Sequence, residues 1–152
     1  MHIVKKFYVN YKDISKFCLN KNIVSFYCEY NRPVEPDCAV IVLEDGTEIR
    51  IYSFFRVLDE NEIIFSISDY WVDNNISDSI LFVQEQLKGA KIIKIKFNRI
   101  GDCVFLLDNG KKIQIFIDAT KDDPDYIIIN KDKEYYWLSR VENELVTMIG
   151  DE

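Results

Sequence analysis

The chain has a single histidine, although most acid–base and nucleophilic mechanisms at neutral pH use an imidazole. This residue, His2, stands beside the N-terminus. Serine or cysteine triads that need an imidazole base are therefore not expected. The GxGxxG pattern and the GxxxxGK pattern of nucleotide-binding loops do not occur either. We predict a protein that is not an enzyme, with no catalytic residue and no cofactor.

Carboxylates are the other groups that could do chemistry. Asp122, Asp123 and Asp125 gather around Pro124, where they could hold a cation, form an acidic contact surface or belong to a solvated turn. We favour the solvated turn over the cation site, because the cluster does not match the ligand spacing of an EF-hand loop. The spacing of the acids gives no support for a glycosidase-like pair. A cation binder would need two or more acids that converge in a cleft.

The chain also contains four cysteines, Cys18, Cys28, Cys38 and Cys103. None of them lies in a CxxC pair, and His2 alone could add an imidazole, so no metal site is predicted. With no secretion signal, disulfides are not expected. Cys28 and Cys103 stand among apolar residues, which indicates small core side chains.

The charge of the chain bears on its partners. Acidic residues outnumber basic residues by 26 to 19, the net charge is -7, and the sequence pI is about 4.8. An acidic protein repels phosphate, so nucleic acid and anionic membranes are not expected partners, whereas basic proteins or cations fit better. One part of the chain is basic although the net charge is negative, and we interpret it as a solvated sheet face rather than a phosphate-binding ribbon. It comprises Lys91, Lys94, Lys96, Arg99, Lys111 and Lys112.

Length and hydropathy indicate one folded domain. The 152 residues include 48% hydrophobic and 14% aromatic residues, enough for a sizeable core. The longest apolar runs have about five residues, far short of the roughly twenty that a membrane span needs. Polar residues interrupt the N-terminus too early for a signal peptide, so we expect a cytoplasmic protein. We treat residues 1–152 as a single domain with related halves at about 1–76 and 77–152.

An internal repeat organises the chain. Residues 43–52 and 107–116 each contain an apolar run, then Asp-Gly or Asn-Gly, then alternating isoleucines. The dipeptides Asp45-Gly46 and Asn109-Gly110 favour two-residue type I′ hairpin turns. The alternation predicts that the isoleucines of each copy face one side of a sheet and are buried together. They are Ile49, Ile51, Ile113, Ile115 and Ile117.

The same offset continues downstream, where residues 63–65 match 127–129 and residues 59–61 match 123–125. Residues 77–88 have the caps and apolar spacing of a helix, and a weaker helix is predicted at 13–19. The tail, 134–149, has both helical spacing and strand-forming residues, and we favour a hairpin. The predicted fold class is α+β, with two related antiparallel β-rich halves from an internal duplication and one or two short helices.

Several of these segments together resemble a family of small bacterial proteins of unknown function. They are residues 43–51 with Phe54 or Phe55, residues 87–90, residues 107–110 and residues 123–126, and the resemblance spans about residues 24–136. It implies a β-rich duplicated fold and no catalytic residue. Members of this family resemble immunity proteins, which are small partners that neutralise a toxin made by the same cell.

These observations predict a non-enzymatic protein-binding module, of the toxin-neutralising immunity type. Its partner would be a basic protein such as a toxin domain. The predicted contacts are the acidic turns, Asp59 and Glu60 in one half and Asp122, Asp123 and Asp125 in the other. The alternatives are a self-associating structural or regulatory protein that forms homo-oligomers, and a carboxylate-based cation binder.

Overall fold

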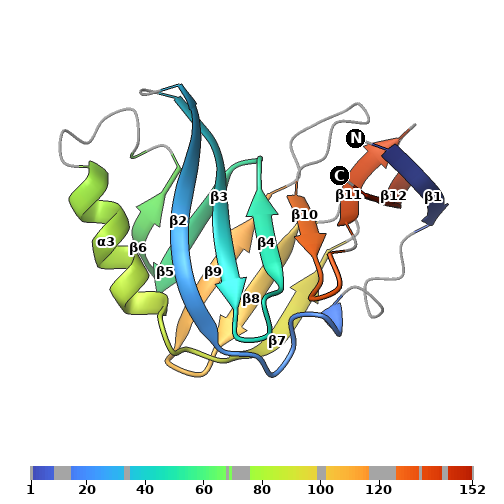
Figure 1. The fold of residues 1–152 in the computed structure, drawn as a ribbon. Helices are drawn as coiled ribbons and strands as arrows, with labels where there is room; N and C mark the ends of the chain where they lie inside the picture. Colours follow the sequence, from blue (N-terminus) through green and yellow to red (C-terminus); the bar gives the residue numbers. More distant parts are fainter. Residues whose placement is uncertain are drawn as a thin grey trace.

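The computed structural model describes residues 2–8, 15–32, 35–67, 69, 76–98, 102–116, 126–133, 135–141 and 144–151. These residues form two antiparallel β-sheets that enclose a common core, with a helix along one side (Figure 1). The fold is β-rich with a helical component, which agrees with the α+β class predicted from the sequence. No helix in the described ranges is long and apolar enough to cross a membrane.

The larger sheet has seven strands and the smaller sheet has five. Across the larger sheet the order is β1 (His2–Tyr8), β12 (Glu144–Asp151), β11 (Tyr135–Val141), β10 (Tyr126–Ile129), β4 (Glu48–Ile51), β3 (Glu35–Leu43) and β2 (Ile23–Arg32). Across the smaller sheet it is β6 (Glu62–Ser66), β5 (Phe55–Asp59), β9 (Lys111–Ile115), β8 (Cys103–Leu107) and β7 (Ile92–Phe97).

The halves of the chain exchange strands between the sheets. Strands β2, β3 and β4 form a meander, and β10 from the second half pairs with β4. Strands β7, β8 and β9 form a second meander, and β5 from the first half pairs with β9. Each sheet therefore contains strands from both halves, and neither half builds a sheet alone.

This exchange corrects one part of the predicted repeat. The sequence matched residues 63–65 with residues 127–129, but the two segments occupy different places. Residues 63–65 belong to β6, which pairs with β5 at a sheet edge, whereas residues 127–129 belong to β10, inside the larger sheet. Strand β5 pairs with the last strand of the second meander, as β10 pairs with the last strand of the first. The two apolar runs have similar compositions, but they pair with different strands and therefore occupy different places in the fold.

Both predicted hairpins form, but with a different turn. In each loop the glycine N–H donates to the carbonyl three residues earlier, at 2.9 Å for Gly46 and 3.1 Å for Gly110. The glycines have φ of +90° and +85°, whereas Asp45 and Asn109 do not have positive φ. The loops therefore have three residues, with a type I turn followed by a left-handed glycine, rather than the predicted type I′ turn.

The core lies between the sheets and includes the predicted isoleucines. Ile49, Ile51, Ile113 and Ile115 are all buried in one cluster, which confirms the predicted apolar face. Ile117 lies outside the described residues. Three core phenylalanines also contact one another with ring centroids 6.0 to 6.2 Å apart, and they are Phe26, Phe55 and Phe65. The interior is thus shared by both meanders.

The helix α3 (Ile76–Leu87) closes one side of the structure, where it packs against β2 and β6 (Figure 1). Its buried residues, Ile80, Val83 and Leu87, recur at helical spacing on one face. Gly89 follows with φ of +84°, the left-handed conformation that commonly ends a helix. These features confirm the helix predicted at 77–88.

Residues at the two ends of the chain extend the larger sheet. Strands β11 and β12 form an antiparallel hairpin, which confirms the hairpin predicted for the tail. The strand β1 pairs with β12, so His2 lies in a paired strand. The described part of the predicted helix at 13–19 is one helical turn, in which the amides of Cys18 and Leu19 donate to the Ser15 carbonyl at 2.9 and 3.0 Å.

The two halves meet through a repeated backbone pattern. Asn22 and Lys91 form an isolated antiparallel bridge. On either side of this bridge, Ile23 and Ile92 each donate a backbone N–H to a carbonyl of the other half, at 2.8 and 3.0 Å. Each meander also has a register shift directly after these residues, in β2 after Ile23 and in β7 after Ile92. The local structure on one side of the bridge is thus repeated on the other.

Candidate functional site

The first predicted contact, Asp59 with Glu60, lies in the turn between β5 and β6. Both side chains are exposed, as are those of Asn61 and Glu62 that follow. Glu60 has φ of +55°, which fits the tight reversal of the chain. This turn therefore presents three carboxylates to solvent. The other predicted contacts, Asp122, Asp123 and Asp125, lie outside the described residues.

The outer face of α3 carries two large apolar side chains that the sequence analysis did not single out. Leu81 is 57% exposed and Phe82 is 52% exposed. Asp78 and Glu85 are also exposed, and at spacings of three and four residues they share the solvent face with Leu81 and Phe82. Helical spacing in the sequence could have identified Leu81 and Phe82 as exposed, because neither residue lies on the face that contains Ile80, Val83 and Leu87.

The helix and the acidic turn belong to adjacent elements. Strand β6 begins directly after the turn and packs beside α3 (Figure 1). Its residue Ile63 is 56% exposed, so the strand beside the helix also presents a large apolar side chain to solvent. We name this surface the acidic–apolar face, and it consists of Asp59, Glu60, Glu62, Ile63, Asp78, Leu81, Phe82 and Glu85. Apolar groups surrounded by charge are typical of protein-binding surfaces.

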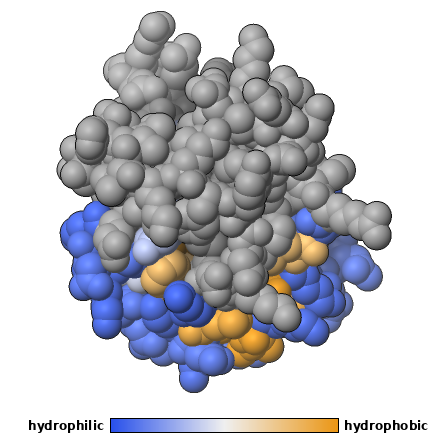
Figure 2. Space-filling view, turned by 90° about the vertical axis from the view of Figure 1, so that its right-hand side faces the viewer, coloured by the Kyte–Doolittle hydropathy of each residue, from blue (hydrophilic) through white to orange (hydrophobic). Residues whose placement is uncertain are grey.

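The side of the molecule away from α3 has a different character. There the described surface is mostly hydrophilic, with a few apolar residues along its lower part (Figure 2). Some exposed apolar surface of this kind is normal for folded proteins. The acidic–apolar face differs because three large apolar side chains come from adjacent elements.

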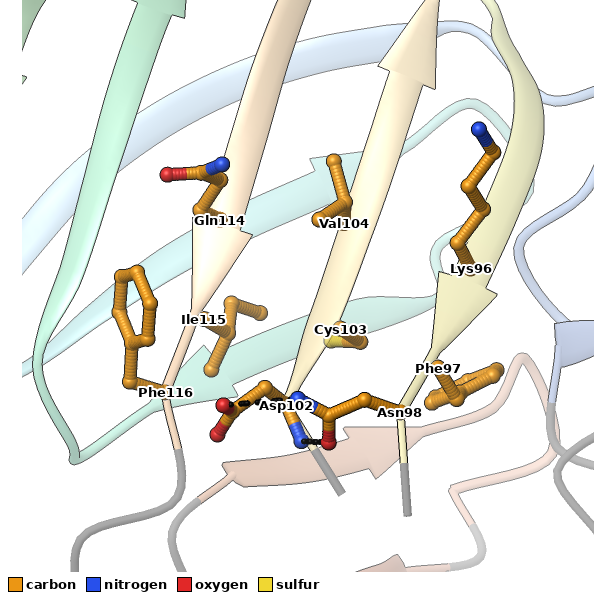
Figure 3. Close-up of a pocket in the computed structure, with 9 residues that line it drawn as sticks. All are labelled: Lys96, Phe97, Asn98, Asp102, Cys103, Val104, Gln114, Ile115 and Phe116. Atoms are coloured by element: carbon orange, nitrogen blue, oxygen red, sulfur yellow. Dashed lines mark hydrogen bonds between the residues drawn. The ribbon is translucent and has the colours of Figure 1, made fainter. Parts of the chain in front are cut away.

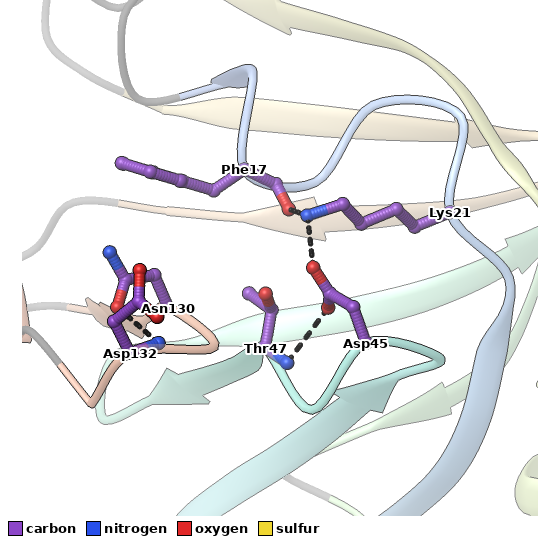
Figure 4. A network of polar contacts seen from close by, with 6 residues as sticks. All are labelled: Phe17, Lys21, Asp45, Thr47, Asn130 and Asp132. Carbon is purple, nitrogen blue, oxygen red and sulfur yellow. Dashed lines mark hydrogen bonds and ion pairs between the residues drawn. The ribbon is translucent and has the colours of Figure 1, made fainter.

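A second candidate region is a cavity beside the β3–β4 loop, where several charged residues contribute to the lining. Its volume is about 320 Å³, and its lining includes Lys16, Lys131 and Asp132. At its base, Lys21 Nζ donates to a carboxylate oxygen of Asp45 at 2.5 Å (Figure 4). The lining thus contains three ammonium groups and two carboxylates, with one pair already engaged.

The hydrogen bonds of Asp45 explain its ionisation. Burial favours the neutral carboxyl, but the hydrogen bonds from Lys21 and Thr47 outweigh burial and lower the pKa of Asp45 to about 2. The backbone N–H of Thr47 donates to the other carboxylate oxygen at 2.9 Å. Lys21 also donates to the Phe17 carbonyl at 2.5 Å. We assign this network a structural role, since it ties residues 15–21 to the loop.

A cluster around Arg50 crosses the larger sheet. Its Nη1 donates to Glu29 on β2 at 2.8 Å, and its Nη2 donates to Glu48 on β4 at 3.2 Å. Burial acts to lower the pKa of Arg50, but the hydrogen bond and the charge of Glu29, with Glu48, raise it above its usual range. Arg50 therefore stays charged and links two strands across β3.

Two of the described thiols, those of Cys18 and Cys28, are poor nucleophiles at neutral pH. Burial raises the pKa of Cys18 to about 12 and that of Cys28 to about 11. Both side chains are therefore protonated near pH 7, and a thiolate is the reactive form. Within the described part of the chain, no group of three or more histidine, cysteine, aspartate or glutamate side chains is placed to hold a metal ion.

A smaller cavity of about 230 Å³ lies on the outer side of the five-stranded sheet. Its lining includes Lys96, Val104 and Gln114, which come from three neighbouring strands, and Phe116, which directly follows β9 (Figure 3). At its lower end, Asn98 Nδ2 donates to an Asp102 carboxylate oxygen at 3.0 Å. The cavity is open to solvent and continues into the surface of the sheet.

Comparisons with protein-family models, with curated proteins and with solved structures found no match. The class of the protein is therefore described by its own architecture, which is a small two-sheet β-rich protein with one side closed by a helix. Its candidate functional regions are the acidic–apolar face and two cavities.

Proposed function

We propose that this protein is a non-enzymatic binding module that recognises a basic protein through the acidic–apolar face. The observation that carries the proposal is the exposure of Leu81 and Phe82, both above one half, between Asp78 and Glu85 on the outer face of α3. Such apolar side chains become anchors when a partner covers them, while the charged rim guides the encounter.

The chemistry of the partner follows from charge. The chain carries a net charge of -7, and the acidic–apolar face contributes five acidic side chains. This charge attracts a basic partner over long range and repels nucleic acid. A toxin domain that acts on nucleic acid is itself basic, and an acidic inhibitor could occupy its site by charge mimicry. An immunity protein that acts in the cytoplasm would have this function.

The two halves also support a proposal about origin. We propose that they derive from duplication of one unit, followed by exchange of the strands that complete each meander. The matched hydrogen bonds around Asn22 and Lys91 support this proposal, as do the register shifts at corresponding places in β2 and β7. The matched hairpin loops at Gly46 and Gly110 add a second region of likeness.

The binding function can be tested by affinity purification with matched variants. The wild-type chain, the double variant Leu81→Ala with Phe82→Ala, and the control Ile93→Ala are immobilised and exposed to lysate of the source cell. Ile93 is a fair control because it is 52% exposed on β7, away from α3. We expect a basic protein retained by the wild type and the control, and bound about tenfold more weakly by the double variant.

Charge reversal tests the contribution of each predicted acidic turn to binding separately. Asp59→Lys with Glu60→Lys should slow association with the retained protein, and added salt should reduce the difference from the wild type. Reversal of Asp122, Asp123 and Asp125 tests the second turn by the same measurement. An unchanged association rate in either variant removes that turn from the interface. Retention of the same proteins by all variants contradicts the proposed face.

A further inference from the structure

The outer face of the five-stranded sheet concentrates positive charge on a protein whose net charge is negative. The strand registers place its side chains in two rows, each of which crosses β5, β9, β8 and β7. One row is Arg56, Gln114, Val104 and Lys96, and the other is Leu58, Lys112, Leu106 and Lys94. We name these eight residues the basic sheet face.

The charged residues of this face are all cations. Lys94 and Lys96 are exposed, while Arg56 and Lys112 are half-buried. None of the four forms an ion pair with a carboxylate among the residues that the structure describes. Neighbouring strands lie about 4.8 Å apart, so each row extends for roughly 15 Å. The sheet thus presents four positive charges over a surface that is wide enough for a polypeptide segment.

One of these cations is fixed in place. Arg56 Nε donates to Gln114 Oε1 at 2.5 Å, and its guanidinium lies over the Phe116 ring at 5.2 Å from the centroid. A guanidinium held in this way loses less conformational entropy when it binds a carboxylate. The cavity of about 230 Å³ lies beside it and is lined by Lys96, Val104, Gln114 and Phe116 (Figure 3).

We propose that the basic sheet face binds an acidic protein segment in which carboxylates alternate with aliphatic side chains. The pattern of the second row supports this chemistry, because Lys112, Leu106 and Lys94 alternate between basic and apolar, while Leu58 at the end of the row is buried. Carboxylates would pair with the cations, and aliphatic groups would contact Leu106 and Val104, both half-buried. Alternate side chains of an extended segment point to one face, so the two patterns can match.

A nucleic acid fits this face less well. Single strands are bound through exposed aromatic rings on which bases stack. The two rows contain no aromatic residue, and the nearby Phe116 ring is covered by Arg56 and packs against Phe54 at 5.6 Å. The net charge of -7 also opposes a densely charged phosphate chain more than a segment with a few carboxylates.

This inference goes beyond the proposed function, since it concerns another surface and a partner of opposite charge. The test uses the 152-residue protein and a short fluorescein-labelled peptide that repeats Glu-Glu-Leu-Leu, so that each face of the extended peptide alternates Glu with Leu, with binding followed by fluorescence anisotropy. The variant is Lys94→Glu with Lys96→Glu. The control is Lys88→Glu with Lys131→Glu, which changes two exposed lysines elsewhere and gives the same net charge. A labelled single-stranded oligothymidylate serves as the competing probe.

We expect the wild type and the control to bind the peptide with similar affinity, and the Lys94/Lys96 variant to bind it at least tenfold more weakly. The oligothymidylate should bind more weakly than the peptide. Equal loss of peptide binding in the control and the Lys94/Lys96 variant would show an effect of net charge alone and overturn the proposal. Absence of peptide binding by the wild type, or preference for the oligothymidylate, would also overturn it. The Leu81→Ala with Phe82→Ala variant keeps the net charge and should bind the peptide normally, so the two proposals can fail independently.

Discussion

Asp45 and Asp59 are both aspartates at the turn of a hairpin, yet their surroundings give them different roles. Asp45 accepts hydrogen bonds from Lys21 and from the backbone of Thr47, so its charge is used within the fold. Asp59 is exposed, and no described lysine or arginine forms an ion pair with it. Sequence reasoning identified both as turn residues, but their partners in space decide which one can meet another protein.

The low pKa of Asp45 predicts how its ion pair responds to pH. Its pKa falls from 3.8 to about 2 on folding, so the pair stabilises the protein above about pH 4 and loses this effect as the pH falls through about 2. Asp45→Asn should lower the free energy of unfolding by about 0.5–1 kcal/mol near neutral pH, because the pair is partly exposed.

Urea denaturation of the wild type and of Asp45→Asn at several pH values measures this effect. The difference between them should be constant around neutral pH and should shrink as the pH falls from about 4 towards 2. Glu44→Gln provides the control, since the neighbouring carboxylate is exposed. A difference that persists unchanged at the lowest pH would argue against a stabilising charge on Asp45.

Among the elements, the two hairpin loops have the same geometry and should respond alike to substitution. Gly46 and Gly110 both have left-handed φ, and an added Cβ at either position meets no atom within 4 Å. Gly46→Ala and Gly110→Ala should therefore each destabilise the protein by about 1 kcal/mol through backbone strain alone. Gly→Asn at the same positions should cost less, because asparagine tolerates this conformation better. Thermal unfolding of the four variants checks the ranking.

The core strands give a second prediction at this scale. Ile113 is fully buried between the sheets, whereas Ile93 on β7 is 52% exposed. Ile113→Ala should lower the free energy of unfolding by about 2–5 kcal/mol, because it removes buried methyl groups and leaves a cavity. Ile93→Ala should change it by about 0.5 kcal/mol or less. Denaturant midpoints that coincide for the two variants would place the core elsewhere.

The elements that could be predicted are those that local sequence determines. The hairpins at Gly46 and Gly110, the helix α3 and the tail hairpin depend on turn residues and short-range periodicity. The pairing of β4 with β10 and of β9 with β5 could not be predicted, because similar apolar runs compete for the same place. The rows of the basic sheet face could not be predicted either, since only the strand registers place Arg56 and Lys96 in the same row.

On the scale of the whole molecule, charge is divided between surfaces. Acidic side chains surround the exposed apolar residues of α3 and β6, whereas cations occupy the outer face of β5, β9, β8 and β7. The net charge of -7 conceals this division, and composition alone predicted only the acidic part. A molecule with surfaces of opposite charge can hold two partners of different chemistry at once.

The exchange of strands makes a prediction about the integrity of the whole chain. Each meander is completed by a strand from the other half, and the core isoleucines Ile49 and Ile113 lie in one cluster. A half on its own would leave an unpaired strand edge and exposed apolar residues. Two fragments produced by a cut between residues 67 and 76 should therefore be largely unfolded when separate. Mixed in equal amounts, they should regain strand-type circular dichroism and a cooperative unfolding transition.

The dependence of refolding on concentration distinguishes this expectation from independent folding. Reassembly of two fragments is bimolecular. The midpoint temperature for unfolding of the reassembled complex should therefore rise with fragment concentration, while that of the intact chain should not. Ile113→Ala in the second fragment should weaken reassembly, because the cluster that it joins includes residues of the first. If either fragment alone unfolds cooperatively with the stability of the intact chain, then the exchanged strands do not hold the two halves together.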